Sequence, residues 1–289
     1  MTINTFLFEN KDHVSGPRLL IFGAIHGNES CGPIAIDRVI DKIKSGAISI
    51  ERGSVRFVPV CNERAYRENK RFVEQDLNRI FKKSDTPESY ESLVANELCA
   101  LMETGTDAFL DVHSSTATGP TSVFIDYPTP ENKAFAEALG TEYALLDWPK
   151  VYEENVYGFD SYDTTRYAYN IGITGVIVEC GQHQDLQTAI VAEEIILRAL
   201  THFKIISALK DKTSLGAPRS IYMKSLEKKI AAEDVFEKEW KHLEALPAGT
   251  HIATRASGEA LYAKHDCVMI LPKLHAKPGG EWFYLGTAV

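Results

Sequence analysis

The chain has 289 residues, of which 44% are hydrophobic and 25% are charged. This size and composition exclude a small disulfide-stapled scaffold and a disordered chain, and they are typical of a globular protein with a substantial core. The formal net charge of −9 makes nucleic acid and anionic membrane surfaces poor partners.

The first two thirds of the chain alternates short β-rich runs with longer helical patterns. This alternation predicts an α/β fold in which helices flank a mixed, mostly parallel sheet. We expect strands at residues 18–24, 55–60, 108–112, 121–125 and 175–180. We expect helices at residues 30–46, 88–105, 130–139 and 185–203. Ligands bind such sheets at the carboxyl ends of the strands, so the residues that follow each strand are the first candidates for function.

After about residue 210 the pattern changes to short β-like runs separated by Pro and Gly. The segment 211–220 reads as a linker, and the acidic segment 233–242 as a solvated helix face or loop. We therefore predict a catalytic domain at residues 1–210 and a small β-rich domain at residues 211–289.

The five cysteines are an odd number, widely spread and without a C-x-x-C pair, which indicates reduced thiols. The N-terminal residues lack the basic and apolar regions of a signal peptide, and no apolar stretch approaches the length of a membrane span. We expect a soluble cytoplasmic protein.

The turn after the first strand of this series contains His26 and Glu29, separated by Gly27 and Asn28. This H-x-x-E spacing lets both side chains face one point if the chain turns tightly there. The alternative is that Glu29 lies in the first turn of the following helix, where the helix dipole favours it, and that His26 is a polar loop residue.

A second histidine, His113, follows the strand that ends in Asp111 and Val112. Two imidazoles and one carboxylate form a three-ligand zinc site with an open position for water, so His26, Glu29 and His113 are predicted metal ligands. Asp111 would orient the His113 ring, or else serve as a strand-end cap or an ion-pair partner.

Glu179 ends an almost fully apolar strand. Burying a carboxyl group there is costly unless it has a partner or a function. A zinc hydrolase needs a general base that takes a proton from water and delivers it to the leaving amine, and Glu179 fits that role. The alternative is an ion pair with an arginine at the rim of the sheet. His183, four residues later, reads as a polar loop residue.

The segment from Arg71 to Arg79 is rich in arginine and includes Asn78. A fixed guanidinium can hold a substrate carboxylate in a bidentate pair, and another can stabilise an oxyanion. Taken alone, such a loop is more often a solvated surface.

Together the motifs H-G-N-E, D-L-N-R-I-F, D-V-H-S and V-E-C-G resemble the succinylglutamate desuccinylase/aspartoacylase family, a branch of the zinc-carboxypeptidase-like fold. The resemblance spans residues 18–200 in order and spacing. It implies one Zn²⁺ ion per chain on the three ligands named above, and Glu179 as the general acid and base. It further implies that Arg71 polarises the scissile carbonyl and that Asn78 and Arg79 bind the carboxylate of the amino-acid moiety.

One more segment resembles aspartoacylase in particular, from Tyr162 to Arg166. There Tyr162 and Arg166 would bind the second carboxylate of an acidic amino acid, or else the segment is an ordinary helix start. Aspartoacylase also contributes a tyrosine from its C-terminal part. Tyr262 and Tyr284 are candidates for it, without a motif behind them.

The sequence thus predicts a zinc-dependent amidohydrolase that deacylates a small anionic N-acyl amino acid, of N-acylaspartate or N-succinylglutamate type. The alternatives are a zinc metallo-carboxypeptidase acting on peptide C-termini and a catalytically silent binding module. A homo-oligomer is compatible with the sequence, and neither nucleic acid nor a membrane is expected as a partner.

Overall fold

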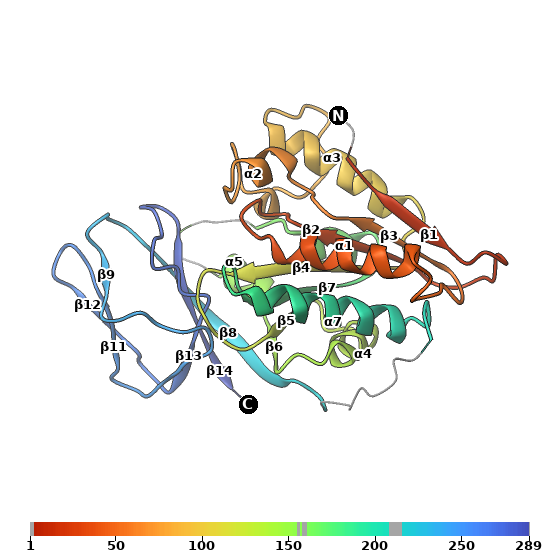
Figure 1. The fold of residues 1–289 in the computed structure, drawn as a ribbon. Helices are drawn as coiled ribbons and strands as arrows, with labels where there is room; N and C mark the ends of the chain where they lie inside the picture. The colour runs from red at the N-terminus through yellow and green to blue at the C-terminus, as the bar shows by residue number, and fades with distance from the viewer. Residues whose placement is uncertain (1–2, 155–156, 158–160, 208–215, 289) are drawn as a thin grey trace.

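The computed structural model describes residues 3–154, 157, 161–207 and 216–288. Figure 1 shows a central sheet with helices on both faces and a β-rich part, built from C-terminal residues, at one side. The strands are β1 (Phe6–Glu9), β2 (Arg18–Gly23), β3 (Ser54–Val58), β4 (Ala108–Ser115), β5 (Ser122–Ile125), β6 (Tyr143–Leu146), β7 (Thr174–Gln182), β8 (Arg219–Lys228), β9 (Val235–Phe236), β10 (Ala245–Leu246), β11 (His251–Thr254), β12 (Ala260–Tyr262), β13 (Cys267–Ile270) and β14 (Glu281–Ala288). The helices are α1 (Cys31–Lys44), α2 (Glu63–Arg67), the 3-10 helix η1 (Leu77–Arg79), α3 (Tyr90–Glu103), α4 (Pro130–Leu139), α5 (Trp148–Glu153), α6 (Thr164–Asn170) and α7 (Leu186–His202).

The main sheet has the strand order β1-β3-β2-β4-β7-β5-β6-β8-β14-β13-β10. β3, β2, β4 and β7 run parallel to one another, whereas β5 pairs with β7 in the antiparallel direction. The predicted α/β class is confirmed. Because β2, β4 and β7 are parallel neighbours, their carboxyl ends meet at one edge of the sheet.

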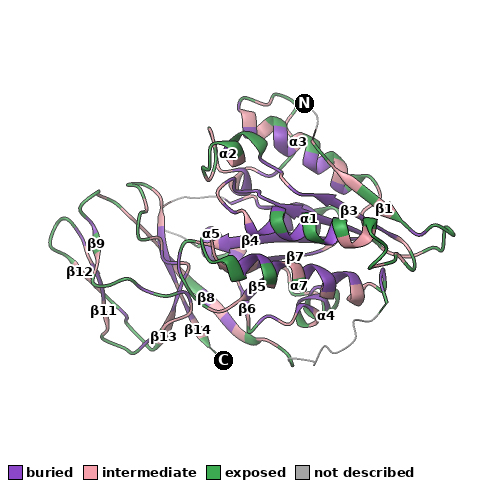
Figure 2. Cartoon of the chain, viewed as in Figure 1, coloured by how far each residue is buried: buried purple, intermediate pink, exposed green. Residues whose placement is uncertain are grey.

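Helices cover both faces of this sheet because the strands are apolar on both faces. In β2, Leu19 and Ile21 pack into the core under α1, α4 and α7. Leu20 and Phe22, which alternate with them, pack into the core under α3 and α6. Figure 2 shows the central strands buried and the outer faces of the helices exposed.

The four predicted helices form within two residues of their expected ends, because capping residues fix their boundaries. The Ser89 side chain accepts a hydrogen bond from the backbone N–H of Ser92 and completes a capping box at the start of α3. Helix α4 begins at Pro130 after the cap residue Thr129 and ends at Gly140, which has φ +72°. β1, β6 and the short helices α2 and α5 were not predicted, since four to six residues carry little periodicity.

The C-terminal strands extend the same sheet. β8 pairs in parallel with β6, and β14, β13 and β10 follow in antiparallel order. β9, β11 and β12 form a separate three-stranded sheet. The predicted boundary at 210/211 and the first half of the predicted linker, through residue 215, lie outside the described residues. Within the described residues, no helix is both long enough and apolar enough to cross a membrane.

The acidic segment 233–242 is less solvated than predicted. Asp234, Trp240 and His242 are buried. The Asp234 carboxylate accepts hydrogen bonds from three backbone N–H groups and from Arg255, which anchors the turn before β9. His242 lies between the loop before β5 and the loop after β13, where Nε2 contacts Ser122 Oγ at 3.1 Å.

Candidate metal centre and active site

The loop between β2 and α1 carries His26 and Glu29. It is held close to α2, because a Cβ atom on Gly27 would lie 2.1 Å from the carbonyl carbon of Ala65. Only glycine allows this approach. Gly27 N–H donates to the carbonyl of Arg71, which ties the loop to the arginine segment (3.1 Å). Glu29 precedes the cap residue of α1, so it does not lie in the first helical turn as the alternative interpretation required.

His113 and Glu179 lie on neighbouring strands, β4 and β7, and are directly opposed in the parallel register. Both strands continue beyond the predicted ends, β4 to Ser115 and β7 to Gln182. The loop after β2 joins them at the same edge, since Gly23 at the end of β2 is paired with Val112 of β4. The sheet therefore brings the three predicted strand-end groups together.

His26, Glu29 and His113 are buried, and one potential ligand atom of each lies within 4.8 Å of the others. The Glu29 carboxylate lies between the rings, with Oε1 at 2.8 Å from His26 Nδ1 and Oε2 at 3.0 Å from His113 Nδ1. Burial alone would raise the pKa of Glu29, but the charges of His26 and His113 hold it well below its ordinary value. The carboxylates of Asp111 and Glu29 raise the pKa of His113 despite its burial.

The donor set fits a divalent metal ion of the zinc type. Two imidazole nitrogens and one carboxylate are the protein ligands of many catalytic zinc sites. The outward-facing nitrogen of each ring also meets a carboxylate, as metal-bound histidines usually require. His26 Nε2 lies 3.1 Å from Asp76 Oδ1, and His113 Nε2 lies 2.9 Å from Asp111 Oδ2, without the alignment of a hydrogen bond. This contact agrees with the orienting interpretation of Asp111.

Glu179, opposite His113 in the register, is half-buried, and its buried Oε2 has no hydrogen-bond partner among the described residues. Burial raises the pKa of Glu179 to about 8, and the negative charge of Glu29 adds to this effect. The charges of His113, Arg71 and Lys273 oppose it. A carboxyl group that titrates near neutral pH can both take up and release a proton.

Arg71 lies beside the cluster of His26, Glu29 and His113. Its Nε donates to Asp76 Oδ2 at 2.8 Å, and Nη1 lies 3.7 Å from Glu29 Oε1. Asp76 is a site residue that the sequence analysis did not single out, although it lies inside the D-L-N-R motif. Its Oδ1 also accepts from the backbone N–H of Asn78 (3.0 Å). Burial would raise the pKa of Asp76, but Arg71 and His26 hold it well below its ordinary value.

Asn78 and Arg79 lie on η1, next to Asp76. Asn78 Oδ1 accepts from the backbone N–H of Thr164 (3.2 Å). The amide oxygen of Asn78 therefore faces α6, and its NH₂ group can donate to another partner. Arg79 forms a bidentate pair with Glu281 of β14, from Nε to Oε1 at 2.8 Å and from Nη2 to Oε2 at 2.9 Å. The Glu281 pair joins the C-terminal part to the site, and the sequence did not predict it.

Three further C-terminal or neighbouring groups meet at Glu281. Lys273 Nζ donates to Glu281 Oε2 at 2.6 Å, and the Tyr152 hydroxyl donates to Oε1. Tyr284 is fully buried, and its hydroxyl lies 2.7 Å from that of Tyr152. Of the two candidate tyrosines, Tyr284 therefore reaches this cluster, whereas Tyr262 is 54% exposed and stacks on His251.

Tyr162 and Arg166 lie together at the start of α6. The guanidinium of Arg166 stacks over the Tyr162 ring at 4.5 Å, and its Nη1 donates to the carbonyl of Ser161 (2.8 Å). The backbone N–H of Tyr162 donates to the carbonyl of Arg79 (3.0 Å), which links this pair to the arginine segment. Asp163 caps the helix, as the alternative interpretation of this segment expected.

The comparisons with known proteins agree with this architecture. A sequence profile of the succinylglutamate desuccinylase/aspartoacylase catalytic domain matches residues 15–203. The chain belongs to this family. A succinylglutamate desuccinylase of Pseudomonas fluorescens is 27% identical over 172 residues, which cover 55% of this chain and 51% of that protein. A probable aspartoacylase of Nostoc sp. is 27% identical over 122 residues, 39% of this chain and 40% of that protein. The match with these curated relatives thus spans about half of their length or less.

Solved structures of the family share the fold over almost the whole chain. A succinylglutamate desuccinylase from Vibrio cholerae has a TM-score of 0.77 at 18% identity, covering 99% of this chain and 85% of that one. A succinylglutamate desuccinylase/aspartoacylase from Rhodobacter sphaeroides has a TM-score of 0.76 at 18% identity, covering 99% of this chain and 88% of that one. The product-bound ectoine utilization protein EutE (DoeB) of Ruegeria pomeroyi has a TM-score of 0.75 at 19% identity, and the match covers 99% of this chain and 88% of that one.

In this member of the desuccinylase/aspartoacylase family the matched catalytic domain ends at residue 203, so Lys273 and Glu281 lie beyond it.

His183 lies within the matched domain. The sequence predicts a polar loop residue there, but the structure shows a side-chain contact. His183 is partly buried, with Nδ1 at 2.8 Å from Ser114 Oγ, next to the predicted ligand His113. Burial lowers the pKa of His183, which favours the neutral imidazole.

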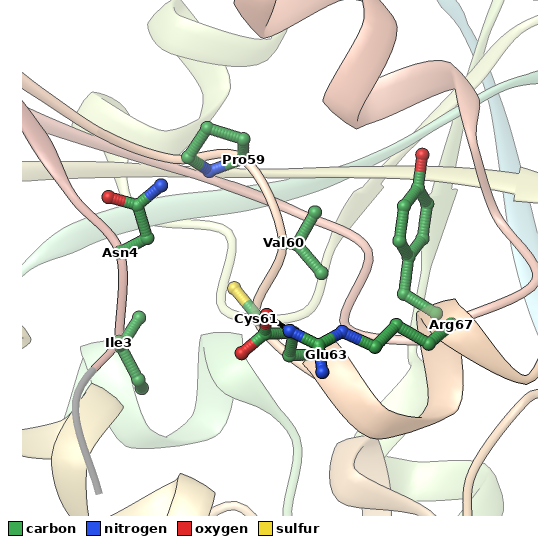
Figure 3. A pocket seen from close by; sticks show the side chains of 8 residues that line it. Ile3, Asn4, Pro59, Val60, Cys61, Glu63 and Arg67 are labelled. Carbon is green, nitrogen blue, oxygen red and sulfur yellow. Dashed lines mark hydrogen bonds and ion pairs between the residues drawn. The ribbon is translucent and has the colours of Figure 1, made fainter.

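A hollow of about 300 Å³ lies beside α2. Figure 3 shows Glu63 and Arg67 meeting at one side of it, below Val60 and Cys61. The hollow is lined by Ile3, Asn4, Pro59, Val60, Cys61, Glu63, Tyr66 and Arg67. None of the predicted site residues lines it, so it adds no group to the metal centre.

Proposed function

We propose that the chain is a zinc-dependent deacylase that hydrolyses the amide bond of a small N-acyl amino acid, of N-acylaspartate or N-succinylglutamate type. One observation carries the proposal: the convergence of His26, Glu29 and His113 beside Glu179, whose buried Oε2 has no hydrogen-bond partner among the described residues. Membership of the desuccinylase/aspartoacylase family supports the same reaction.

His26, Glu29 and His113 would hold the zinc ion through Nδ1, a carboxylate oxygen and Nδ1. Bound there, zinc lowers the pKa of a coordinated water molecule and polarises the substrate carbonyl. Asp76 lies at the outer nitrogen of the His26 ring and Asp111 at that of the His113 ring, so these carboxylates would orient the two rings with their inner nitrogens toward the metal.

Glu179 acts as the proton carrier. Its raised pKa lets the carboxylate take a proton from the attacking water and, as the C–N bond breaks, deliver that proton to the leaving amine nitrogen. The nearby positive charge of Arg71, fixed by Asp76, stabilises the oxyanion that develops on the former carbonyl oxygen.

Asn78 and Arg79 provide donors for the substrate carboxylate. Three of the five Arg79 N–H groups are used by Glu281 and by the carbonyl of Asn78, so two remain for a ligand. Tyr162 and Arg166 would contact a second carboxylate at the edge of this site. The contact between Arg79 and the C-terminal strand β14 favours a small substrate over a long peptide, and so favours the deacylase over the carboxypeptidase alternative.

The test is Glu179→Gln, assayed with zinc-loaded protein on a panel of N-acetyl, N-formyl and N-succinyl amino acids and short peptides, with free amine detected by mass spectrometry. We expect wild-type protein to deacylate acidic N-acyl amino acids, and the variant to keep its zinc and lose about 10²- to 10⁴-fold in kcat. Glu137→Gln, at an exposed position on α4, is the matched control. Near-wild-type turnover by Glu179→Gln would overturn the mechanism, and release of C-terminal residues from peptides would favour the carboxypeptidase.

A further inference from the structure

Lys273 belongs to the loop between β13 and β14, in the part of the chain that the matched catalytic domain does not cover. Its backbone N–H donates to the carbonyl of Trp282 at 2.8 Å, which fixes the loop against β14. The preceding residue, Pro272, accepts a hydrogen bond from Thr116 Oγ1 at 3.4 Å. Thr116 follows β4, the strand that carries His113. The loop therefore lies beside the edge of the sheet where the metal centre is built.

The Lys273 ammonium and the Arg79 guanidinium meet at a single oxygen atom. Glu281 Oε2 accepts from Lys273 Nζ at 2.6 Å and from Arg79 Nη2 at 2.9 Å. The two cations are thus neighbours, held in place by one carboxylate. The charge of Lys273 also acts on Glu179, where it lowers the pKa against the larger effect of burial.

The carboxylate of Glu281 neutralises only one of these two cations. An ammonium group has three N–H donors, and among the described residues Glu281 is the acceptor that the structure shows for Lys273 Nζ. Two further N–H groups of Arg79 have no acceptor among the described residues. Lys273 is only 26% exposed at its side chain, and burial lowers its pKa, so water stabilises its ammonium charge poorly.

Two adjacent cations that share one carboxylate and keep unused donors can bind a second carboxylate. Charge-assisted hydrogen bonds to a carboxylate are the strong ones, and their strength grows where water is excluded. Glu281 can hold the two cations side by side for such a ligand. Its two carboxylate oxygens accept hydrogen bonds from both cations and from the hydroxyl of Tyr152.

We propose that Lys273 binds a carboxylate of the substrate jointly with Arg79, as a specificity-determining residue supplied by the C-terminal part of the chain. This inference rests on the proposed deacylase function, because it takes the substrate to be an N-acyl amino acid. The carboxylate is either the α-carboxylate or the side-chain carboxylate of an acidic amino acid, and the two offer the same chemistry.

The test compares Lys273→Met, which keeps much of the apolar stem, with Lys273→Arg, which keeps the charge. Lys277→Met is the matched control, since Lys277 lies in the same loop and is exposed. The substrates are the N-acylaspartate or N-acylglutamate that the wild-type chain cleaves, its α-amide and its side-chain amide. Each amide removes one carboxylate without changing the shape of the substrate much.

We expect Lys273→Met to lower kcat/KM for the diacid about 10- to 100-fold, chiefly through KM. On the amide that lacks the recognised carboxylate the variant and the wild type should differ little, because that interaction is already gone. On the other amide the full loss should persist, and this identifies the carboxylate. Lys273→Arg should recover most of the loss, and Lys277→Met should match the wild type.

An equal loss on all three substrates would indicate a purely structural role for Lys273 and would overturn the inference, as would no loss on any of them. If the wild-type chain cleaves no substrate, the proposed function fails independently, and calorimetric titration with L-glutamate, isoglutamine and glutamine decides the inference. Weaker binding of L-glutamate by Lys273→Met, without an equal change for both amides, would support it. Unchanged binding would refute it.

Discussion

Replacing Asp76 by Asn tests how the histidine ligands are held. Asp76 accepts from His26 Nε2 at 3.1 Å, from Arg71 Nε at 2.8 Å and from Asn78 N at 3.0 Å. An asparagine keeps one oxygen, which can still accept from Asn78 and cap η1. The amide nitrogen, however, would face the Arg71 donor, and the bond from His26 would no longer be charge-assisted.

The expected size of the effect follows from these contacts. A hydrogen bond to a charged group contributes about 1.5–3 kcal/mol and a neutral one about 0.5–1.5 kcal/mol, so the His26 contact should lose about 1–2 kcal/mol. If this free energy appears in metal binding, zinc affinity falls about tenfold. Asp76→Ala removes the acceptor entirely and should approach the 100-fold loss typical of deleting the group that orients a ligand.

Zinc affinity is measured by competition with a chromophoric chelator at pH 7.5, and circular dichroism checks the fold. Asp85→Asn, the same change at an exposed loop position, is the control and should bind zinc as the wild type does. An unchanged affinity in Asp76→Asn would show that Asp76 does not orient His26. The proposed role of the carboxylates that contact the outer ring nitrogens of the histidines would then be wrong.

For Asp76→Asn we also expect an effect of pH on the free energy of unfolding. The pKa of Asp76 is held well below its ordinary value of about 4 in the folded chain, so the folded state gains stability from the ionised carboxylate. This contribution is complete above about pH 4 and is lost as the pH falls through the lowered pKa. In urea unfolding of the metal-free protein, the difference between wild type and Asp76→Asn should therefore be constant near neutral pH and shrink below about pH 4. A difference that grows on acidification would contradict the assigned ion pair.

Two further predictions concern backbone packing and the C-terminal part. Gly27→Ala places a Cβ atom 2.1 Å from the carbonyl carbon of Ala65. We therefore expect a loss of about 3 kcal/mol in the free energy of unfolding, and weaker zinc binding. Wild-type values for both quantities would disprove the close approach. Asp234→Ala removes the acceptor of three backbone N–H groups and of Arg255, and should cost about 2–4 kcal/mol in urea unfolding. Glu233→Ala, exposed beside it, should cost little, and equal losses in the two variants would contradict the assignment.

Much of the fold follows from local patterns in the sequence. The strand β2, apolar on both faces, and helices with clear caps are specified by residues that are close in sequence, so their positions were predictable within about two residues. The direction of β5 and the existence of β6 were not, because both depend on which neighbour a four-residue strand finds in the sheet.

The sequence alone indicated the convergence of His26, Glu29, His113 and Glu179, because groups at the ends of parallel strands meet at one edge of a sheet. It could not indicate that Asp76 faces His26, since this contact depends on how the loop at Gly27 packs against α2.

The C-terminal contributions were decided by tertiary structure alone. Arg79 and Glu281 are separated by 202 residues, and no spacing rule links them. Their pairing arises because β8 joins β6 and thereby carries β14 into the same sheet, where its first residue reaches η1. Local sequence determines which residues can do metal and proton chemistry. The long-range order of the strands determines which charged groups from the far end of the chain are brought beside that chemistry.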